Sequence, residues 1–279
     1  MDTRLCTRFA PSPTGLLHLG HVASASYGWR RARDAGGRFL LRLEDIDPSR
    51  CRPGFADAIL RDLAWLGLAW DGPVRVQSAH LADYRAVLDT LAARDLLYPC
   101  FCTRADIAAS VSAPHSAPDG TALYPGTCRG LDPGRRADLL AGGVPHALRL
   151  DMARACRIAG RLDRLEEGQG RLACDPASFG DVVLARKEVA ASYHLCVTHD
   201  DALQQVTLIT RGEDLAASAD LHRLLQALLG WPEPAYAHHR LLRDARGVRL
   251  AKRDRALTVQ ALREQGFGPD AVRAMAERA

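Results

Sequence analysis

RFAPSPTGLLHLGH, from Arg8 to His21, is the stretch from which the rest of the chain can be understood. It begins with an apolar run, which predicts a short buried strand. Two prolines and a glycine within residues 11–15 predict a turn. Residues 19–33 lack proline and are rich in Ala and Arg, which indicates a helix. His18 and His21 therefore stand at the start of a helix, around a glycine that lets a ligand approach the backbone. Because helix N-termini offer free N–H groups and a positive dipole end, we expect a phosphate site here.

A second strand and a cluster of acids follow this helix. Residues 38–43 are apolar enough for a strand of a parallel sheet, so strand, helix and strand make a βαβ unit. Glu44, Asp45 and Asp47 come directly after that strand, where ligands of such folds bind. Asp47 before a proline also suits the N-cap of the next helix, but a cap requires only one acid. The sequence therefore predicts an α/β fold with a binding edge beyond these strands.

The composition is that of a globular protein without a membrane span. The chain has 279 residues, of which 47% are hydrophobic and 25% charged, enough for a core in one or two domains. Its 37 basic and 33 acidic residues leave a net charge of +4, which permits nucleic-acid binding without arguing for it. It has no N-terminal apolar segment with a cleavage site and no apolar run long enough for a bilayer. We therefore expect a cytoplasmic protein.

Three of the eight cysteines suggest a metal site. Cys100 and Cys102 form a Cys-x-Cys pair, and Cys128 returns after a segment rich in Ala, Ser, Pro and Gly. A zinc ion could close such a loop, because thiolates are zinc ligands and the loop lacks its own core. The candidates for the fourth ligand are Tyr124 and His115, and chemistry alone favours His115 because imidazole is the commoner ligand. The alternative is that the three thiols are ordinary buried cysteines.

These motifs together resemble the class I aminoacyl-tRNA synthetases of the glutamyl type. RFAPSPTG and the HLGH that follows are similar to the family's first signature and its HIGH box, and RLEDIDP to a second signature. The resemblance implies a Rossmann-type catalytic domain that binds ATP with Mg²⁺, L-glutamate and tRNA. It implies that Glu44 holds the substrate ammonium group and that arginines bind a substrate carboxylate. The implied ATP-binding residues are His18, Gly20 and His21, the histidines being catalytic, and the implied glutamate-binding residues are Arg8, Ala10, Ser12, Glu44, Tyr193 and Arg211.

A basic loop near the C-terminus is similar to the family's second ATP motif, the KMSKS loop. Lys252 fits the crucial second lysine of that motif, so the resemblance implies that Lys252 binds ATP and acts in catalysis. Arg249 replaces the first lysine and keeps its charge, whereas Ala251 replaces the serine and loses a hydroxyl. The change removes a hydrogen bond to phosphate and leaves charge stabilisation in place. Without the family, such a loop would be interpreted as solvated surface.

The cysteine pattern narrows the resemblance to short relatives of glutamyl-tRNA synthetase that act on queuosine. Those proteins carry Cys-x-Cys and then Tyr-x-x-x-Cys, with the tyrosine as a zinc ligand, and Tyr124 and Cys128 fit that spacing. The resemblance thus implies structural zinc on Cys100, Cys102, Tyr124 and Cys128. The segment between Cys102 and Tyr124 is longer than we expect of the family, so its middle is expected to be a surface insertion.

The expected organisation is a catalytic domain at residues 1–257, with a zinc-binding substructure at 99–130, and a helical stub at 258–279. Full glutamyl-tRNA synthetases continue into an anticodon-binding domain, and this sequence does not. The resemblance implies ATP-dependent formation of glutamyl-adenylate and transfer of glutamate to queuosine in the anticodon of tRNA-Asp, by a monomer. The alternatives are a shortened glutamyl-tRNA synthetase that charges a tRNA 3′ end and a non-catalytic tRNA-binding module.

Overall fold

A computed structural model of the chain describes residues 4–103, 105–107, 116–187, 189, 191–242 and 258–278. No helix within these ranges is long and apolar enough to cross a membrane. The strands are β1 (Cys6–Phe9), β2 (Arg38–Leu43), β3 (Arg75–Val76), β4 (Leu97–Cys100), β5 (Ala147–Leu150), β6 (Asp163–Glu166), β7 (Gly170–Ala173), β8 (Val183–Ala185), β9 (Leu208–Gly212) and β10 (Ala235–His239). The helices are α1 (Leu19–Asp34), α2 (Pro53–Trp65), α3 (Leu81–Ala92), α5 (Pro133–Ala141), α6 (Met152–Ala159), α7 (Tyr193–Leu203), α8 (Ser218–Leu229), α9 (Val259–Glu264) and α10 (Pro269–Arg278).

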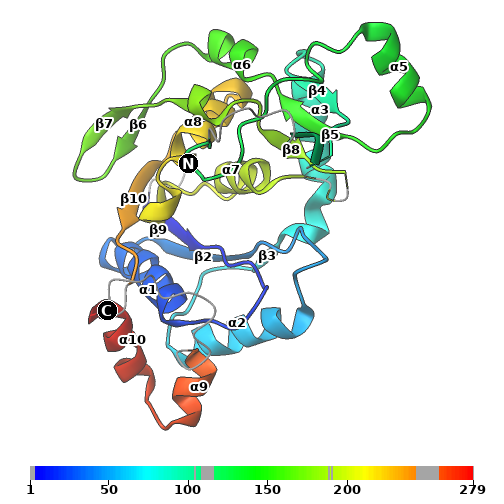
Figure 1. The fold of residues 1–279 in the computed structure, drawn as a ribbon. Coiled ribbons are helices and arrows are strands. Elements are labelled where there is room, and N and C mark those ends of the chain that lie inside the picture. Colours follow the sequence, from blue (N-terminus) through cyan, green and yellow to red (C-terminus); the bar gives the residue numbers. More distant parts are fainter. Residues whose placement is uncertain are drawn as a thin grey trace.

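Two groups of parallel strands meet side by side at the centre of the molecule (Figure 1). One has the order β1-β2-β3, and the other has the order β6-β10-β9, with β7 antiparallel at its outer edge. They join where β1 lies beside the start of β9: the N–H of Thr207 donates to the carbonyl of Cys6 over 2.9 Å. The chain thus winds outward from β1 in one direction and from β9 in the other, which is the doubly wound α/β arrangement. The predicted Rossmann-type fold is confirmed, and so is the βαβ unit β1-α1-β2.

One hydrophobic core lies between the β1-β2-β3 strands and the helices at the two ends of the chain. Phe39 and Leu41 of β2 pack in this core with Leu63 of α2. Val259 of α9 and Val272 of α10 belong to the same core, although they follow Leu63 in the sequence by about two hundred residues. The two C-terminal helices (orange and red in Figure 1) therefore lie beside α1 and α2 (dark and light blue) and pack into the same core.

A second core supports the other side of the central sheet. It contains apolar side chains of α3, α6, α7 and α8, with Leu150 of β5 and Leu184 of β8. The strands β4, β5 and β8 form a separate antiparallel sheet, which lies at the opposite end of the molecule from α9 and α10 (Figure 1). The two cores flank the junction of β1 and β9, and they leave the carboxyl ends of the central strands open.

The segment from residue 193 to 197 belongs to helix α7, although its apolar run in the sequence would also suit a strand. Ser192 is the N-cap of α7, and its hydroxyl accepts a hydrogen bond from the N–H of Leu195 over 3.4 Å. Leu195, Cys196 and Val197 are all buried, so this stretch of the helix shows no polar face. A short apolar run of this kind cannot be told from a buried strand by periodicity alone.

Candidate functional site

A cavity of about 650 Å³ opens at the carboxyl ends of the central strands. Its walls come from the loop after β1, the first turn of α1, the ends of β2, β9 and β10, and the first residue of α7. It lies at the switch point between β1 and β9, where doubly wound folds bind their ligands. The structure brings together here every expected ATP- or glutamate-binding residue that it describes: Arg8, Ala10, Ser12, His18, Gly20, His21, Glu44, Tyr193 and Arg211.

The first turn of α1 is capped by two histidines. His18 is the N-cap residue, and its Nδ1 accepts a hydrogen bond from the N–H of Gly20 over 3.1 Å. The Nδ1 of His21 accepts one from the N–H of His18 over 3.2 Å, and the two rings stack with centroids 3.8 Å apart. Since both Nδ1 atoms accept, both rings carry their proton on Nε2. A Cβ on Gly20 would lie 3.0 Å from the His18 ring, so a larger residue would require that ring to shift.

The two arginines of the cavity differ in how their charge is balanced. Arg8 is buried in a bidentate pair with Asp201, with Nε and Nη2 at 2.9 and 3.2 Å from the two carboxylate oxygens. Arg211 is equally buried, yet it makes no ion pair with any carboxylate in the part of the chain described here. It donates to His222 and His238, both over 3.2 Å, and its Nη2 has no partner among the described residues. Arg211 therefore offers an unbalanced positive charge and an unused donor.

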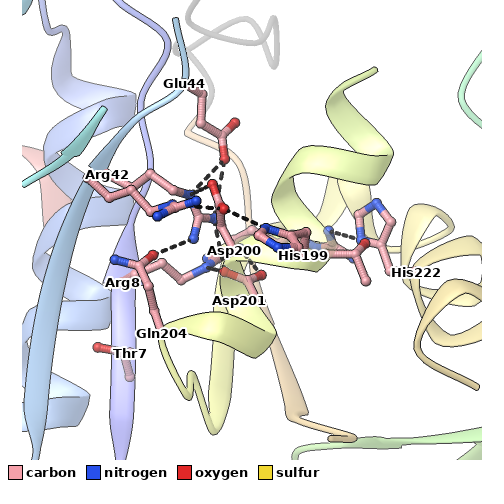
Figure 2. Close-up of polar contacts among 12 residues, drawn as sticks. Thr7, Arg8, Arg42, Glu44, His199, Asp200, Asp201, Gln204 and His222 are labelled. Carbon is pink, nitrogen blue, oxygen red and sulfur yellow. Dashed lines mark hydrogen bonds and ion pairs between the residues drawn. The ribbon is translucent and has the colours of Figure 1, made fainter. Parts of the chain in front are cut away.

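Glu44 is held at the end of β2 by a buried ionic network (Figure 2). Arg42 is fully buried and lies 3.3 Å from Glu44 and 2.9 Å from Asp201. Burial raises the pKa of Glu44 to about 7, because it outweighs the opposite effects of Arg42 and Arg8. Burial also disfavours the charged form of Asp201, but Arg8 and Arg42 bring its pKa below the usual value. Glu44 is thus the acid of this network that is poised to gain or lose a proton near neutrality.

Asp200 and Asp201, which hold most of this network together, were not predicted from the sequence. Asp200 accepts hydrogen bonds from Arg75, Gln77 and Tyr84, all within 2.9 Å, and so anchors α7 to the chain after β2. Asp201, the next residue, holds Arg8 and Arg42 (Figure 2). Two adjacent acids that follow an apolar run are a signal for buried ion pairs, because carboxylates are almost never buried unpaired.

The three cysteines of the expected metal site lie together. The sulfurs of Cys100, Cys102 and Cys128 are all within 4.8 Å of one another. In a tetrahedral site with Zn–S bonds of about 2.3 Å, two sulfurs lie roughly 3.8 Å apart, so the cluster fits this geometry. The Tyr124 hydroxyl lies 3.5 Å from the sulfur of Cys102 and accepts from the N–H of Cys128 over 2.8 Å. Burial opposes ionisation of Cys128, but the hydrogen bond with Tyr124 contributes to a lowered pKa of this thiol. The cluster could hold a metal ion, with Tyr124 beside it.

Lys252, Arg249 and Ala251 of the expected second ATP motif lie outside the described residues. His115, the alternative fourth metal ligand, lies outside them as well. The last described residues before the basic loop, Arg240 to Leu242, line the cavity beside the N-terminus of α1.

Comparison with known proteins assigns the family. Residues 4–279 match the model of the class I tRNA synthetases for glutamate and glutamine, catalytic domain. The doubly wound fold and the cavity at its switch point are those of a class I synthetase catalytic domain, and the chain belongs to this family of ligases.

The relatives and a solved structure agree with this assignment. A protein of Rhodobacter capsulatus named Glutamyl-Q tRNA(Asp) synthetase is 48% identical, over 96% of this chain and 98% of its own length. A protein of Symbiobacterium thermophilum with the same name is 43% identical, over 96% of this chain and 84% of its own length. The crystal structure of a glutamate tRNA ligase from Elizabethkingia meningosepticum, in complex with its amino acid, superposes with a TM-score of 0.76 at 28% identity. That match covers 95% of this chain, which spans 53% of the ligase chain.

Proposed function

We propose that this protein activates L-glutamate with ATP and transfers the glutamyl group to queuosine in the anticodon of tRNA-Asp. The observation that carries the proposal is one cavity in which the unbalanced charge of Arg211 and the carboxylate of Glu44 face the capped start of α1. The relative from Rhodobacter capsulatus, which is of nearly the same length, bears a name that specifies this reaction. In this proposal residues 1–257 are the catalytic domain, 99–130 its zinc-bound substructure and 258–279 a helical stub.

In the activation step, the α-carboxylate of glutamate attacks the α-phosphorus of ATP. A carboxylate–phosphate bond forms, the bond to the β-phosphate oxygen breaks, and pyrophosphate leaves. Catalysis here consists of positioning and of stabilising negative charge, because no side chain needs to form a covalent bond. The N-terminus of α1, His18 and His21 would donate hydrogen bonds to the phosphates, together with Lys252. Mg²⁺ bound with ATP would supply further charge neutralisation.

The amino acid would lie between the two charged groups of the cavity. Glu44 would hold its ammonium group, and Arg211 would bind its side-chain carboxylate, with Ala10, Ser12 and Tyr193 forming the walls. Arg8 can donate further N–H groups, although Asp201 already balances its charge. A neutral glutamine amide would leave the charge of Arg211 unpaired, and an unpaired buried charge is costly.

In the transfer step, a hydroxyl of the cyclopentene diol of queuosine attacks the carbonyl carbon of the adenylate. An ester bond forms, the bond between the carbonyl carbon and the phosphate oxygen breaks, AMP leaves, and the hydroxyl proton passes to solvent. The diol resembles the ribose diol that normally accepts an amino acid. A cleft that accepts an unpaired 3′ end can also accept an anticodon loop, since both present single-stranded nucleotides.

Activation should not require tRNA, because all the assigned groups belong to this chain. We expect glutamate-dependent exchange of radioactive pyrophosphate into ATP by the purified protein alone. Glutamine and aspartate, the control amino acids, should support exchange at least about 100-fold less efficiently, as buried polar groups left unpaired reject a near-isostere. Exchange that depends strictly on added tRNA would contradict this part of the proposal.

Glutamate binding should weaken in acid. The pKa of Glu44 is raised to about 7, so its carboxylate becomes neutral below that pH and no longer attracts the ammonium group. We expect the KM for glutamate to rise roughly tenfold between pH 8 and pH 6, since one pH unit below a pKa leaves about a tenth of the group ionised. Steady-state exchange at several pH values measures this. The KM for ATP is the internal control, and a Glu44→Gln variant should show a raised KM without this titration.

The cysteine cluster should contain zinc at about one ion per chain. Cys100, Cys102, Tyr124 and Cys128 would hold the ion, which would tie the 99–130 segment to β4 and supply structural rigidity. We expect Cys102→Ser and Tyr124→Phe to lower the zinc content measured by atomic absorption, and His115→Ala to retain it. Loss of zinc in His115→Ala with retention in Tyr124→Phe would transfer the fourth position to His115.

A further inference from the structure

The immediate hydrogen-bond partners of Arg211 are histidine nitrogens, and their protonation can be deduced from the bonds they make. A guanidinium group has only donors, so the Nδ1 of His222, 3.2 Å from Arg211 Nη1, must be unprotonated. The proton of His222 therefore lies on Nε2, which is 3.1 Å from Nδ1 of His194 and donates to it. The proton of His194 then lies on its own Nε2, which faces the carboxylate of Asp119 at 3.9 Å.

On the other side of the guanidinium, His238 is also an acceptor. Arg211 Nε donates to Nε2 of His238 over 3.2 Å, so His238 carries its proton on Nδ1. That Nδ1–H donates to Glu166 over 2.8 Å. Arg211 is thus held by two imidazole acceptors, from α8 and β10 (His222 is labelled in Figure 2). A carboxylate lies at the far end of each chain of contacts, hydrogen-bonded in the case of Glu166 and at 3.9 Å in the case of Asp119.

Both imidazoles are in surroundings that keep them neutral. Burial lowers the pKa of His222 well below its ordinary value, and the nearby charge of Arg211 lowers it further. Burial likewise lowers the pKa of His194 to about 4. Burial lowers the pKa of His238 too, and Arg211 acts in the same direction, against the opposite effect of Glu166. One imidazole therefore separates Glu166 from the guanidinium, and two separate Asp119 from it.

The comparison with Arg8 shows what neutral acceptors achieve. Arg8 is positioned by Asp201, whose carboxylate fixes the guanidinium and also cancels its charge. Arg211 is instead held by hydrogen bonds to two uncharged rings, with the ring of Tyr236 at 5.4 Å beneath it. Its charge is therefore not cancelled by a carboxylate, and its buried Nη2 has no partner among the described residues, although Arg211 itself lines the cavity.

We propose that His222 and His238 are positioning residues that orient Arg211 without neutralising it, and that this neutrality sets the preference for a dicarboxylic amino acid. The identity of that amino acid as glutamate rests on the proposed function. The chemical reason is general: a carboxylate at either acceptor position would satisfy Arg211 internally, and the site would lose its advantage for an anionic side chain over an amide.

A matched pair of variants at His222 distinguishes the effect of the residue's charge from the effect of its shape. Gln and Glu have the same size, and both offer an acceptor oxygen at the position of the histidine nitrogen, but only Glu is charged. We expect His222→Gln to retain kcat/KM for glutamate within about tenfold, and His222→Glu to lose roughly a further 30- to 100-fold, the range of a charged hydrogen bond. For glutamine the two variants should differ by less than about threefold, since an amide does not compete for the charge. The same pair at exposed His80 is the control.

A His222→Glu variant as active as the His222→Gln variant would overturn the proposal, whether both lose activity or neither does. Equal large losses would show that the shape of the ring matters and its neutrality does not. Thermal unfolding identifies a variant that does not fold, in which case the same pair at His238 decides.

Histidine ¹⁵N NMR of the wild-type protein tests the tautomers without any substitution. We expect neutral rings at pH 7, with His222 protonated at Nε2 and His238 at Nδ1, and an imidazolium at either position would overturn the proposal. This readout does not depend on the substrate, so a wild-type protein that activates no glutamate would refute the proposed function and leave the proposed tautomers to be judged by NMR.

Discussion

Replacing Arg211 by methionine is expected to lower kcat/KM for glutamate in pyrophosphate exchange by about 10²- to 10³-fold, because one partner of a buried charge pair is removed. Methionine fills a similar volume and supplies no donor, so the substrate carboxylate would be left in the cavity without its cation. The loss should come mainly from glutamate binding, while the KM for ATP should change little, since the phosphates are assigned to the start of α1.

Two further variants make the Arg211 result specific. Arg211→Lys keeps the charge but cannot span both histidine acceptors and the substrate, so we expect it to recover only part of the activity. Arg171→Met removes an exposed arginine of β7 that pairs with Asp163 and Glu233, far from the cavity lining, and should leave kcat/KM unchanged. An Arg211→Met protein that folds and activates glutamate normally would refute the assignment.

The residues of this site that could be predicted from the sequence belong to short motifs that come at or directly after the end of a strand. The stretch from Arg8 to His21 predicted a strand, a turn and a helix that begins at two histidines, and β1 and α1 have that arrangement. That His18 caps this helix was seen only in the structure. Glu44 was found because it comes directly after a parallel strand, where the fold exposes side chains to ligands. Arg211 was implied by the resemblance to the glutamyl-type synthetases, and it lies near the end of β9.

The residues that orient these groups could not be predicted in the same way. Asp201 meets Arg8 from 193 positions away, and the histidines that hold Arg211 come from α8 and β10. Nothing local in the sequence fixes such pairings, since they arise only when the two halves of the sheet join. The helix α7, which carries Asp201, is not evident from the sequence, because residues 195–197 form a short apolar run that would also suit a buried strand.

The largest difference in glutamate transfer is expected between tRNA-Asp that carries queuosine and tRNA-Asp that lacks it. The proposed acceptor is a hydroxyl of the cyclopentene diol, and guanosine at the same position has no such group. Without queuosine we therefore expect glutamate transfer to fall by at least about 100-fold, because the reacting nucleophile is absent rather than misplaced. The activation step should remain unchanged, and pyrophosphate exchange in the same samples provides that control.

The most direct test is the attachment of radioactive glutamate to three forms of tRNA-Asp: with queuosine, without queuosine, and with queuosine but without the 3′-terminal adenosine. The proposed function predicts glutamylation of the first and third forms and not of the second. Glutamylation of the first and second forms but not of the third would place the acceptor at the 3′ end, as in a shortened glutamyl-tRNA synthetase, and would contradict the account.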